Sequence, residues 1–260
     1  MHKPIKSESQ FMRQQFFLLL KLPVTLLMVL AKKKKPGELA RPFTNFGEFI
    51  AQPKVTFWLI MVNILVFFVE IFILTEEQLM GFVFQPGQLL QFKIYPMMAS
   101  WFLHASLAHL AANVVALFIF GRVVEMHFGR KKMLMIYFGS AVISSLFAAL
   151  FGQGGIGASG AIAGVIAVAI LYKPFYMTYL IFGAPIPIII LGWLSIISDI
   201  TGVLVPKNDN IGHFAHLGGY IAVSFLAFLF DQRERKKLLL GLIINILFVA
   251  AVGALFFLLS

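Results

Sequence analysis

Ser159 is the residue best placed for nucleophilic chemistry, because it lies in a Gly-Ala-Ser-Gly tetrapeptide that opens an apolar run. The first turn of a helix leaves backbone N–H groups free and favours negative charge, so it would stabilise an oxyanion formed there. A serine hydroxyl beside an imidazole from another helix is an activated nucleophile. Two other apolar stretches supply imidazole and amide groups, which are His104, His109, Asn113, His213 and His216.

The spacing of these polar groups indicates that they meet at one depth. His109 and Asn113 are four residues apart and therefore share a helix face, about 6 Å apart along the axis. Each feature also has a purely structural explanation, since small residues pack helices closely and a membrane His or Asn bridges neighbouring helices. Their convergence on three apolar segments favours a catalytic site over three separate packing features.

The elements that must position these residues are membrane helices. Hydrophobic residues make up 60% of the 260 residues and charged residues 12%, and the mean hydropathy is +0.91. This composition excludes a disordered chain and, despite the net charge of +10, a soluble nucleic-acid-binding protein. It predicts an all-α polytopic membrane protein. Without cysteine there is no disulfide, thiol nucleophile or cysteine metal site, and we expect neither a metal nor a cofactor.

Seven segments are apolar over about the 20 residues that a membrane helix needs. The fourth is short, and the fifth contains Pro185 and Pro187, which predict a kink or an entry point. An earlier apolar stretch, 16–31, is interrupted by Lys21 and Pro23 and is expected as an interfacial helix. The seven predicted spans are 55–74, 101–124, 133–151, 158–172, 177–203, 211–230 and 238–259.

Basic residues divide unequally between the two sides that these spans define. Of the 21 Lys and Arg residues, 19 fall on one side: ten precede the first span and the others follow the second, fourth and sixth. Only Lys93 and Lys207 fall on the other side. Because basic residues accumulate in cytoplasmic segments, we expect a cytoplasmic N-terminus and an outer C-terminus, in a prokaryotic plasma (inner) membrane. Segment 75–100 is then an outer interfacial loop.

Three motifs occur in order in the second, fourth and sixth spans: His-x4-His-x3-Asn from His104, Gly-x-Ser-Gly from Gly157, and Ala-His-x-x-Gly from Ala215. A Glu-x3-Gly turn at Glu125 follows the second span. Together these motifs resemble those of the rhomboid family of intramembrane serine proteases. The resemblance covers about 55–230 and implies a rhomboid-like six-helix bundle, to which the last span adds a seventh transmembrane helix.

The resemblance also implies a role for each matched residue. Ser159 would be the nucleophile of a catalytic dyad, and His216 its general base and then acid. The oxyanion site would comprise His109, Asn113 and the backbone N–H of Ser159, with Gly157 as a further donor. The other matched or neighbouring residues would be structural or line a cavity: His104 retains water, Gly160 and Gly219 allow close helix approach, and His213 holds water or faces the outer headgroups.

The chain also departs from a full triad and from the family pattern. No acidic residue lies near His216 in the sequence as an orienting third member. Asp199 and Asp209 are candidate neighbours of His216, but we expect them as a polar helix end and a loop residue and predict no triad. Ala163 stands where many relatives carry an aromatic residue that stacks on the base histidine, and Val223 where they often carry glycine. Both changes leave the reacting groups in place.

The expected organisation is a basic cytoplasmic arm (1–54), a six-helix catalytic core (55–230) and a basic turn with the seventh helix (231–260). The resemblance implies cleavage of membrane-anchored proteins, such as single-span helices, near their outer ends. The expected surroundings are the lipid bilayer, and no nucleic acid is expected as a partner. The alternatives are an inactive relative that binds membrane clients, a haem-binding electron carrier with paired histidines, and a transporter, for which we find no inverted repeat of broken helices.

Overall fold

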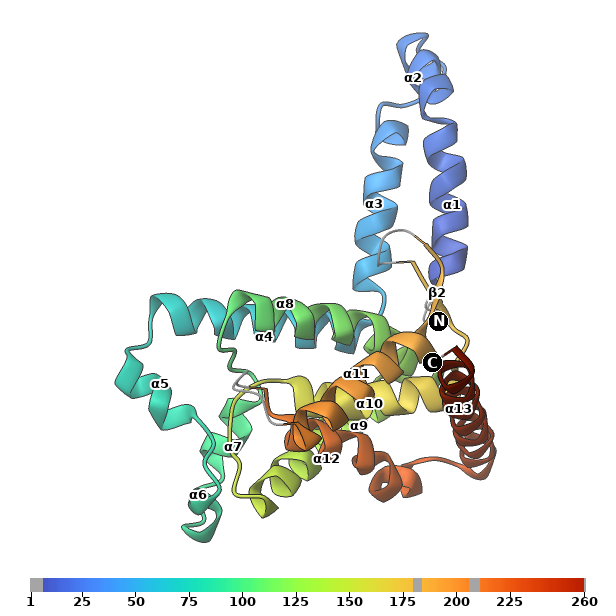
Figure 1. The fold of residues 1–260 in the computed structure, drawn as a ribbon. Coiled ribbons are helices and arrows are strands. Elements are labelled where there is room, and N and C mark those ends of the chain that lie inside the picture. The colour runs from blue at the N-terminus through green and yellow to red at the C-terminus, as the bar shows by residue number, and fades with distance from the viewer. Residues whose placement is uncertain (1–6, 180–183, 206–210, 260) are drawn as a thin grey trace.

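The computed structural model describes residues 7–179, 184–205 and 211–259, and helices dominate it (Figure 1). In these ranges the strands are two residues long, β1 (Met177–Thr178) and β2 (Ile186–Pro187), and they pair antiparallel. The predicted fold class, an all-α membrane protein, is confirmed. The α-helices are α1 (Glu8–Leu20), α2 (Leu22–Leu30), α3 (Gly37–Ala51), α4 (Lys54–Phe72), α5 (Glu76–Phe82), α6 (Gly87–Leu90), α7 (Tyr95–Ser100), α8 (Leu107–Ala116), α9 (Arg122–Leu150), α10 (Ser159–Tyr172), α11 (Ile188–Leu204), α12 (His213–Leu226) and α13 (Gln232–Leu259).

The turn at Glu125 fastens α4 to the start of α9. The Glu125 carboxylate accepts hydrogen bonds from the backbone N–H groups of Val55 and Thr56, at 3.1 and 2.8 Å, and from the Thr56 hydroxyl at 2.9 Å. It therefore caps α4, which has no side-chain cap of its own. Four residues later Gly129 leaves helical geometry with φ +77°, a conformation that glycine adopts readily. This break separates the predicted second and third spans.

The helix α10 is the centre of the molecule, packed against α9, α12 and α13. Every residue from Gly160 to Ile170 is buried. With 14 residues, it rises about 21 Å, less than the ~30 Å hydrocarbon core. The helices α11 and α12 are also short, with 17 and 14 residues. Neighbouring helices surround α10, so it does not have to reach both membrane surfaces.

Length and composition mark three helical segments of the described chain as membrane spans in their own right. They are Lys54–Phe72, the bent run Leu107–Leu150 and Gln232–Leu255; the pair α1 and α2, bent by 47°, would be a fourth if it forms one span. The run Leu107–Leu150 covers two predicted spans. The helices α10 and α11 are apolar but shorter than a span, as the sequence indicated for the fourth one. That α10, α11 and α12 each count as a membrane span stays a prediction.

The structure also corrects the starts of two predicted spans. Segment 101–106 is not helical, so α8 begins six residues later than the sequence indicated. The fifth span was expected from residue 177, but α11 begins after Pro187, because β1 and β2 occupy part of the intervening segment. Lys207, expected on the outer side, and Asp209, expected in a loop, lie outside the described residues.

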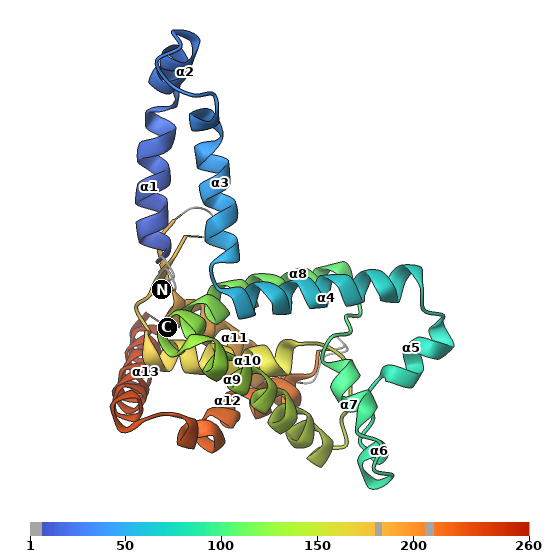
Figure 2. The same cartoon turned by 180° about the vertical axis from the view of Figure 1, so that it is seen from behind.

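The N-terminal helices α1, α2 and α3 form a hairpin that stands out from the core (Figures 1 and 2). Its base is fastened by two buried charged residues. The Glu8 carboxylate accepts from the Thr178 hydroxyl at 2.9 Å. The Arg122 guanidinium lies 3.7 Å above the Phe49 ring and donates to the Phe49 carbonyl at 2.8 Å. The expected interfacial helix 16–31 is thus part of two helices, and its place at the membrane surface stays a prediction.

Segment 75–100 folds into the short helices α5, α6 and α7 and fixes the loop that precedes α10. The backbone N–H of Gly155 donates to the Phe84 carbonyl at 2.9 Å, and that of Gly157 donates to the Ser100 carbonyl at 2.8 Å. Two segments far apart in the sequence are therefore joined at the point where α10 begins.

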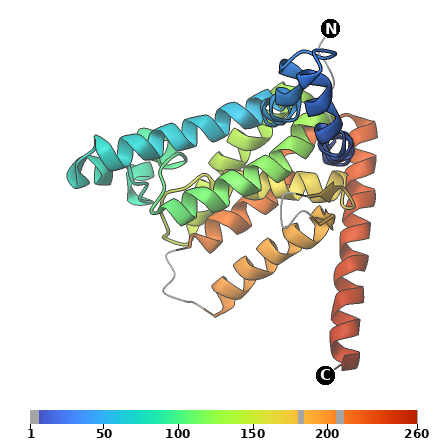
Figure 3. The same cartoon turned by 90° about the horizontal axis from the view of Figure 1, so that it is seen from above.

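The last helix, α13, crosses the far end of α10 steeply (Figures 1 and 3). Gly241 allows this contact, because a Cβ at this position would lie 1.5 Å from the Leu171 carbonyl oxygen. Asn245 donates to the Ile170 carbonyl at 3.0 Å and accepts from the Trp193 indole at 2.7 Å. A fully bonded amide between apolar helices holds α10, α11 and α13 together.

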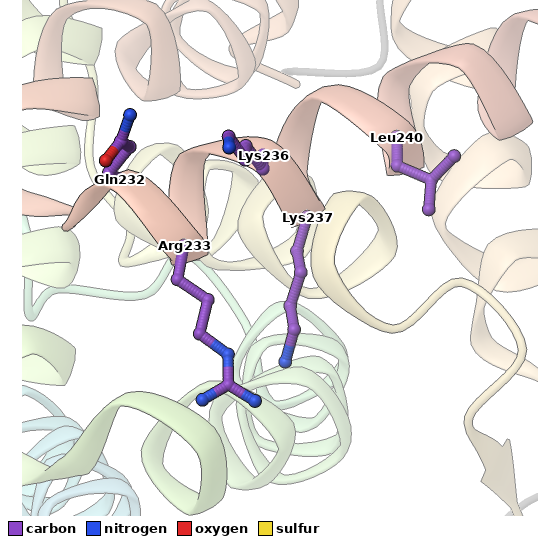
Figure 4. A pocket seen from close by; sticks show the side chains of 5 residues that line it. All are labelled: Gln232, Arg233, Lys236, Lys237 and Leu240. Carbon is purple, nitrogen blue, oxygen red and sulfur yellow. The ribbon is translucent and has the colours of Figure 1, made fainter.

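Basic side chains gather at the start of α13 (Figure 4). They line a hollow of about 370 Å³. The Arg233 and Lys237 side chains extend from the helix in the same direction (Figure 4). Lys237 donates to the Tyr172 hydroxyl at 3.1 Å, and Lys132 pairs with Glu234. Because Tyr172 ends α10 and Ser159 begins it, this basic hollow lies at the opposite end of α10 from the serine.

Candidate active site

Ser159 and His216 face each other where α10 and α12 meet. Ser159 is the first residue of α10 and His216 the fourth residue of α12, and both are half-buried. The distance from Ser159 Oγ to His216 Nε2 is 2.6 Å. A hydroxyl can donate to an imidazole nitrogen at this distance. The two side chains are therefore placed as a nucleophile and a base would be.

Glycines allow the two helices to approach this closely. A Cβ on Gly219 would lie 2.1 Å from the Gly160 carbonyl oxygen, so the backbones of α10 and α12 are in direct contact. A Cβ on Gly164 would lie 1.9 Å from Ser140 Oγ, which brings α9 against the same helix. The departure Ala163 lies in this contact, with its Cβ 2.8 Å from the Cβ position of Gly219. A small residue is thus required on both sides of the seam.

An acidic residue lies behind His216. Asp199, on α11, is 3% exposed. Its Oδ1 lies 2.7 Å from His216 Nδ1 and 2.9 Å from His213 Nδ1. Its Oδ2 accepts from the Tyr220 hydroxyl at 2.8 Å, and that hydroxyl lies 2.8 Å from Ser195 Oγ. The expectation that Asp199 is only a polar helix end is therefore wrong, because α11 turns this residue inward toward α12.

His213 also belongs to this group and does not face the headgroups. It is 7% exposed, and its ring lies against Gly202 of α11, where a Cβ would be 2.1 Å from Nε2. The absence of a side chain at residue 202 leaves the space that the imidazole occupies.

The candidate oxyanion residues lie on the other side of Ser159. Ser106 caps α8 and accepts from the N–H of His109 at 3.1 Å. The His109 ring lies against Gly157, where a Cβ would be 2.9 Å from Nε2 and 3.5 Å from Ser159 Oγ. Asn113, one turn on, uses one N–H to bond the His109 carbonyl at 2.9 Å and has a second hydrogen to donate.

Two expectations about this side of the site need correction. Gly157 was expected to offer its N–H to an oxyanion, but that N–H already donates to the Ser100 carbonyl at 2.8 Å. Its role is conformational instead, since its φ of +127° suits glycine and its missing side chain admits His109. His104 is not on a helix, and its N–H donates to the Glu70 carboxylate at 3.1 Å. Its ring stands 5.1 Å from that of His109.

One group in the described ranges has the composition of a metal site. Asp199, His213 and His216 each place a ligand atom within 4.8 Å of the others. The same atoms are joined by the hydrogen bonds given above, in which each imidazole nitrogen faces a carboxylate oxygen. The donor set suits a divalent cation. An experiment must therefore distinguish a metal site from a hydrogen-bonded group made of the same residues.

Comparison with known proteins identifies a family. Residues 91–233, more than half of the chain, match the sequence model of the Rhomboid domain. This region contains both sides of the site, from His104 to Tyr220. The chain belongs to the rhomboid family. The resemblance seen in the three sequence motifs is thereby confirmed.

Similar rhomboid proteins come from bacteria and from a plant. The chain is 31% identical to the rhomboid protease GluP of Bacillus subtilis over 244 residues, which is 89% of this chain and 45% of that one. It is 31% identical to the rhomboid protease AarA of Providencia stuartii over 45% of this chain and 50% of that one. It is 29% identical to the mitochondrial RHOMBOID-like protein 12 of Arabidopsis thaliana over 56% and 48%. The chain thus spans about half the length of these relatives. Because they include bacterial proteins and a mitochondrial one, the expected location in a prokaryotic membrane stays a prediction.

The sequence indicated His213 and His216 but not their common contact with Asp199, nor the parts played by Tyr220 and Ser195, although a signal was present. His213, His216 and Tyr220 are spaced three and four residues apart, which places them on one helix face. Ser195 and Asp199 have the same relation on α11. Two polar stripes on neighbouring apolar helices are expected to face each other, because charged and polar groups avoid lipid.

Proposed function

We propose that this rhomboid protein is an intramembrane serine endopeptidase that cleaves membrane-anchored proteins. The observation that carries the proposal is the 2.6 Å contact between Ser159 Oγ and His216 Nε2 at the N-terminus of α10. Nucleophile and base side chains within hydrogen-bond reach are the signature of nucleophilic catalysis. The two bacterial relatives named as rhomboid proteases support the same activity.

The reaction proceeds through an ester of Ser159. His216 Nε2 takes the hydroxyl proton while Oγ attacks the peptide carbonyl carbon, forming a tetrahedral oxyanion. The imidazolium then gives that proton to the leaving amide nitrogen as the C–N bond breaks. A water molecule, losing a proton to Nε2, attacks the ester, and the imidazolium returns the proton to Oγ as the carboxylic acid leaves. The serine and the neutral histidine are restored.

The oxyanion would lie between α10 and α8. The backbone N–H of Ser159 is at the first position of α10, where the helix itself supplies no acceptor. His109 Nε2 and the second N–H of Asn113 supply the side-chain donors in this proposal. Donors that are held in place before the reaction stabilise the charge that develops in the transition state.

We place the cleavage near the outer end of the substrate helix. The end of α10 that carries Ser159 is opposite the end where Lys132 and Lys237 gather. Basic residues mark the cytoplasmic side, so the N-terminus would be cytoplasmic and Ser159 would lie toward the outer surface, with α13 ending outside. A substrate anchored in the same bilayer would then present its outer end to the serine.

Labelling with a fluorophosphonate tests the proposal directly, because this reagent forms a stable ester with an activated serine. The folded protein in detergent is expected to be labelled, and peptide mapping should place the label on Ser159. Ser159→Ala should not be labelled, whereas Ser224→Ala, which removes an exposed serine of α12, should be labelled like the unaltered protein. Folded protein that takes up no label would indicate the inactive, client-binding alternative.

Removing one oxyanion donor should slow turnover more than it weakens binding. We expect Asn113→Ala to lower kcat by about 10²-fold with little change in KM, because oxyanion contacts strengthen in the transition state. Steady-state cleavage of a reporter transmembrane helix measures both constants. The matched control is Asn63→Ala, which alters a buried asparagine of α4 that donates to the Leu59 carbonyl of its own helix. Any loss of cleavage activity in this control should be proportional to the loss of folded protein. Equal effects on kcat and KM for Asn113→Ala would remove it from the oxyanion site.

A further inference from the structure

Asp199 supplies a carboxylate to a site for which the sequence predicted only a dyad. Its Oδ1 lies 2.7 Å from His216 Nδ1, on the ring edge opposite the one that meets Ser159. We propose that Asp199 is a positioning residue that orients His216, so that the site works as a Ser–His–Asp array. This inference rests on the proposed protease function and deepens it.

The first argument concerns the proton on His216. An ionised carboxylate has only acceptors, so the nitrogen that faces Asp199 carries the hydrogen. Neutral imidazole has one N–H, and the other nitrogen, Nε2, is therefore free to accept the proton of Ser159. Asp199 thus selects the tautomer that can act as a base. Without it, the ring could rotate or carry its hydrogen on the wrong nitrogen.

The second argument is that the carboxylate is itself fixed. His213 donates to the same Oδ1, and Tyr220 donates to Oδ2 at 2.8 Å. Because the single hydroxyl hydrogen of Tyr220 goes to Asp199, Ser195 donates to the Tyr220 oxygen. A buried charge is costly unless its oxygens are bonded, and here both are. The carboxylate that faces His216 is therefore rigid.

The third argument separates this role from a simple link between α11 and α12. His213 and Tyr220 alone would satisfy both carboxylate oxygens and join the two helices. The additional donor is His216, the only member of the group that also contacts Ser159. When His216 takes a proton during the reaction, the adjacent negative charge stabilises the imidazolium.

Asp199→Asn tests the proposal, since it keeps the shape of the side chain and removes its charge. We expect kcat for a reporter transmembrane helix to fall by about 10³-fold, with KM changed less than threefold and the melting temperature of the detergent-solubilised protein close to the original. The rate of fluorophosphonate labelling should fall in parallel. A downfield proton resonance from His216 Nδ1–H, present in Ser159→Ala, should be absent when Asp199→Asn is added. A folded Asp199→Asn protein with kcat within threefold of the original would overturn the proposal and leave the protease function standing.

A second variant covers the case in which Asp199→Asn does not fold. Tyr220→Phe keeps Asp199 and its bond to His216 but removes the donor to Oδ2. The carboxylate is then held less firmly, and the loss of one hydrogen bond is expected to lower kcat by roughly threefold to tenfold with KM unchanged. The matched control is Tyr95→Phe, an exposed tyrosine of α7, which should keep the original kcat. An unchanged kcat in Tyr220→Phe together with unfolding of Asp199→Asn would assign Asp199 a structural role and contradict the proposal.

A chelator distinguishes the array from a metal site built from the same residues. If hydrogen bonds hold Asp199, His213 and His216, treatment with EDTA followed by its removal should leave kcat unchanged. Loss of activity with EDTA and its return with Zn²⁺ would show that a cation occupies the group. That result would overturn the positioning role, because a metal on His216 Nδ1 would replace its bond to Asp199.

Discussion

His216→Ala is expected to lower kcat/KM for a transmembrane substrate by roughly 10⁴-fold, since the variant loses both the general base and the general acid. Nothing else in the described part of the chain is in a position to replace them. The His109 imidazole is also close to Ser159, but its ring lies beside Gly157 on the oxyanion side. Fluorophosphonate labelling of Ser159 should fall with the cleavage rate, because both reactions need the activated hydroxyl.

The control for His216→Ala is the same change at His127. That histidine lies beyond the N-terminal turn of α9, where Nδ1 contacts the Val123 carbonyl at 2.8 Å and the ring meets the Tyr172 ring edge to face. It is therefore at the end of α10 remote from Ser159, and His127→Ala should keep kcat within a few-fold. Both variants should retain the melting temperature and elution volume of a folded protein. A folded His216→Ala protein that still labels and cleaves normally would contradict the assignment of the base.

The residues around Ser159 could be predicted from the sequence because their signals are local. Glycine beside serine at the start of an apolar run predicts a helix N-terminus with room around it, and the spacing of His109 and Asn113 predicts one helix face. These patterns need no knowledge of how the helices are arranged. The placement of Ser159 near His216 then follows from the small residues Gly160 and Gly219, which mark the sides on which α10 and α12 can touch.

The role of Asp199 could not be predicted in the same way, because it depends on the rotation of α11 about its own axis. The predicted start of that segment was wrong, because apolar residues continue through the strands β1 and β2. A span expected from residue 177 places Asp199 near a membrane surface. Asp199 does lie close to the C-terminal end of α11, which ends at Leu204, but the rotation of the helix turns it toward His213 and His216. The prediction that the Gly157 N–H binds the oxyanion was wrong for a related reason. That N–H donates to the carbonyl of Ser100, which belongs to a distant segment of the sequence.

A large effect is also expected from Gly219→Ala, a change of one methyl group in the contact between α10 and α12. Its Cβ would lie 2.1 Å from the Gly160 carbonyl oxygen, and this atom belongs to backbone that cannot yield as a flexible side chain would. The helices α10 and α12 must therefore separate, which carries Ser159 away from His216. Overpacking of this kind costs about 1–3 kcal/mol of stability, and a displacement of about 1 Å between reacting groups lowers the rate by roughly 10²-fold.

Matched measurements separate this effect from a general intolerance of glycine replacement. Gly253→Ala, in α13, adds the same methyl group where no atom lies within 4 Å. It should leave kcat unchanged and slightly stabilise its helix, because alanine has the higher helix propensity. In Gly219→Ala we expect the cleavage rate to fall much further than the amount of folded protein, since the defect is one of alignment. If both variants cleave at the original rate, backbone contact between α10 and α12 is not what holds the serine against its base.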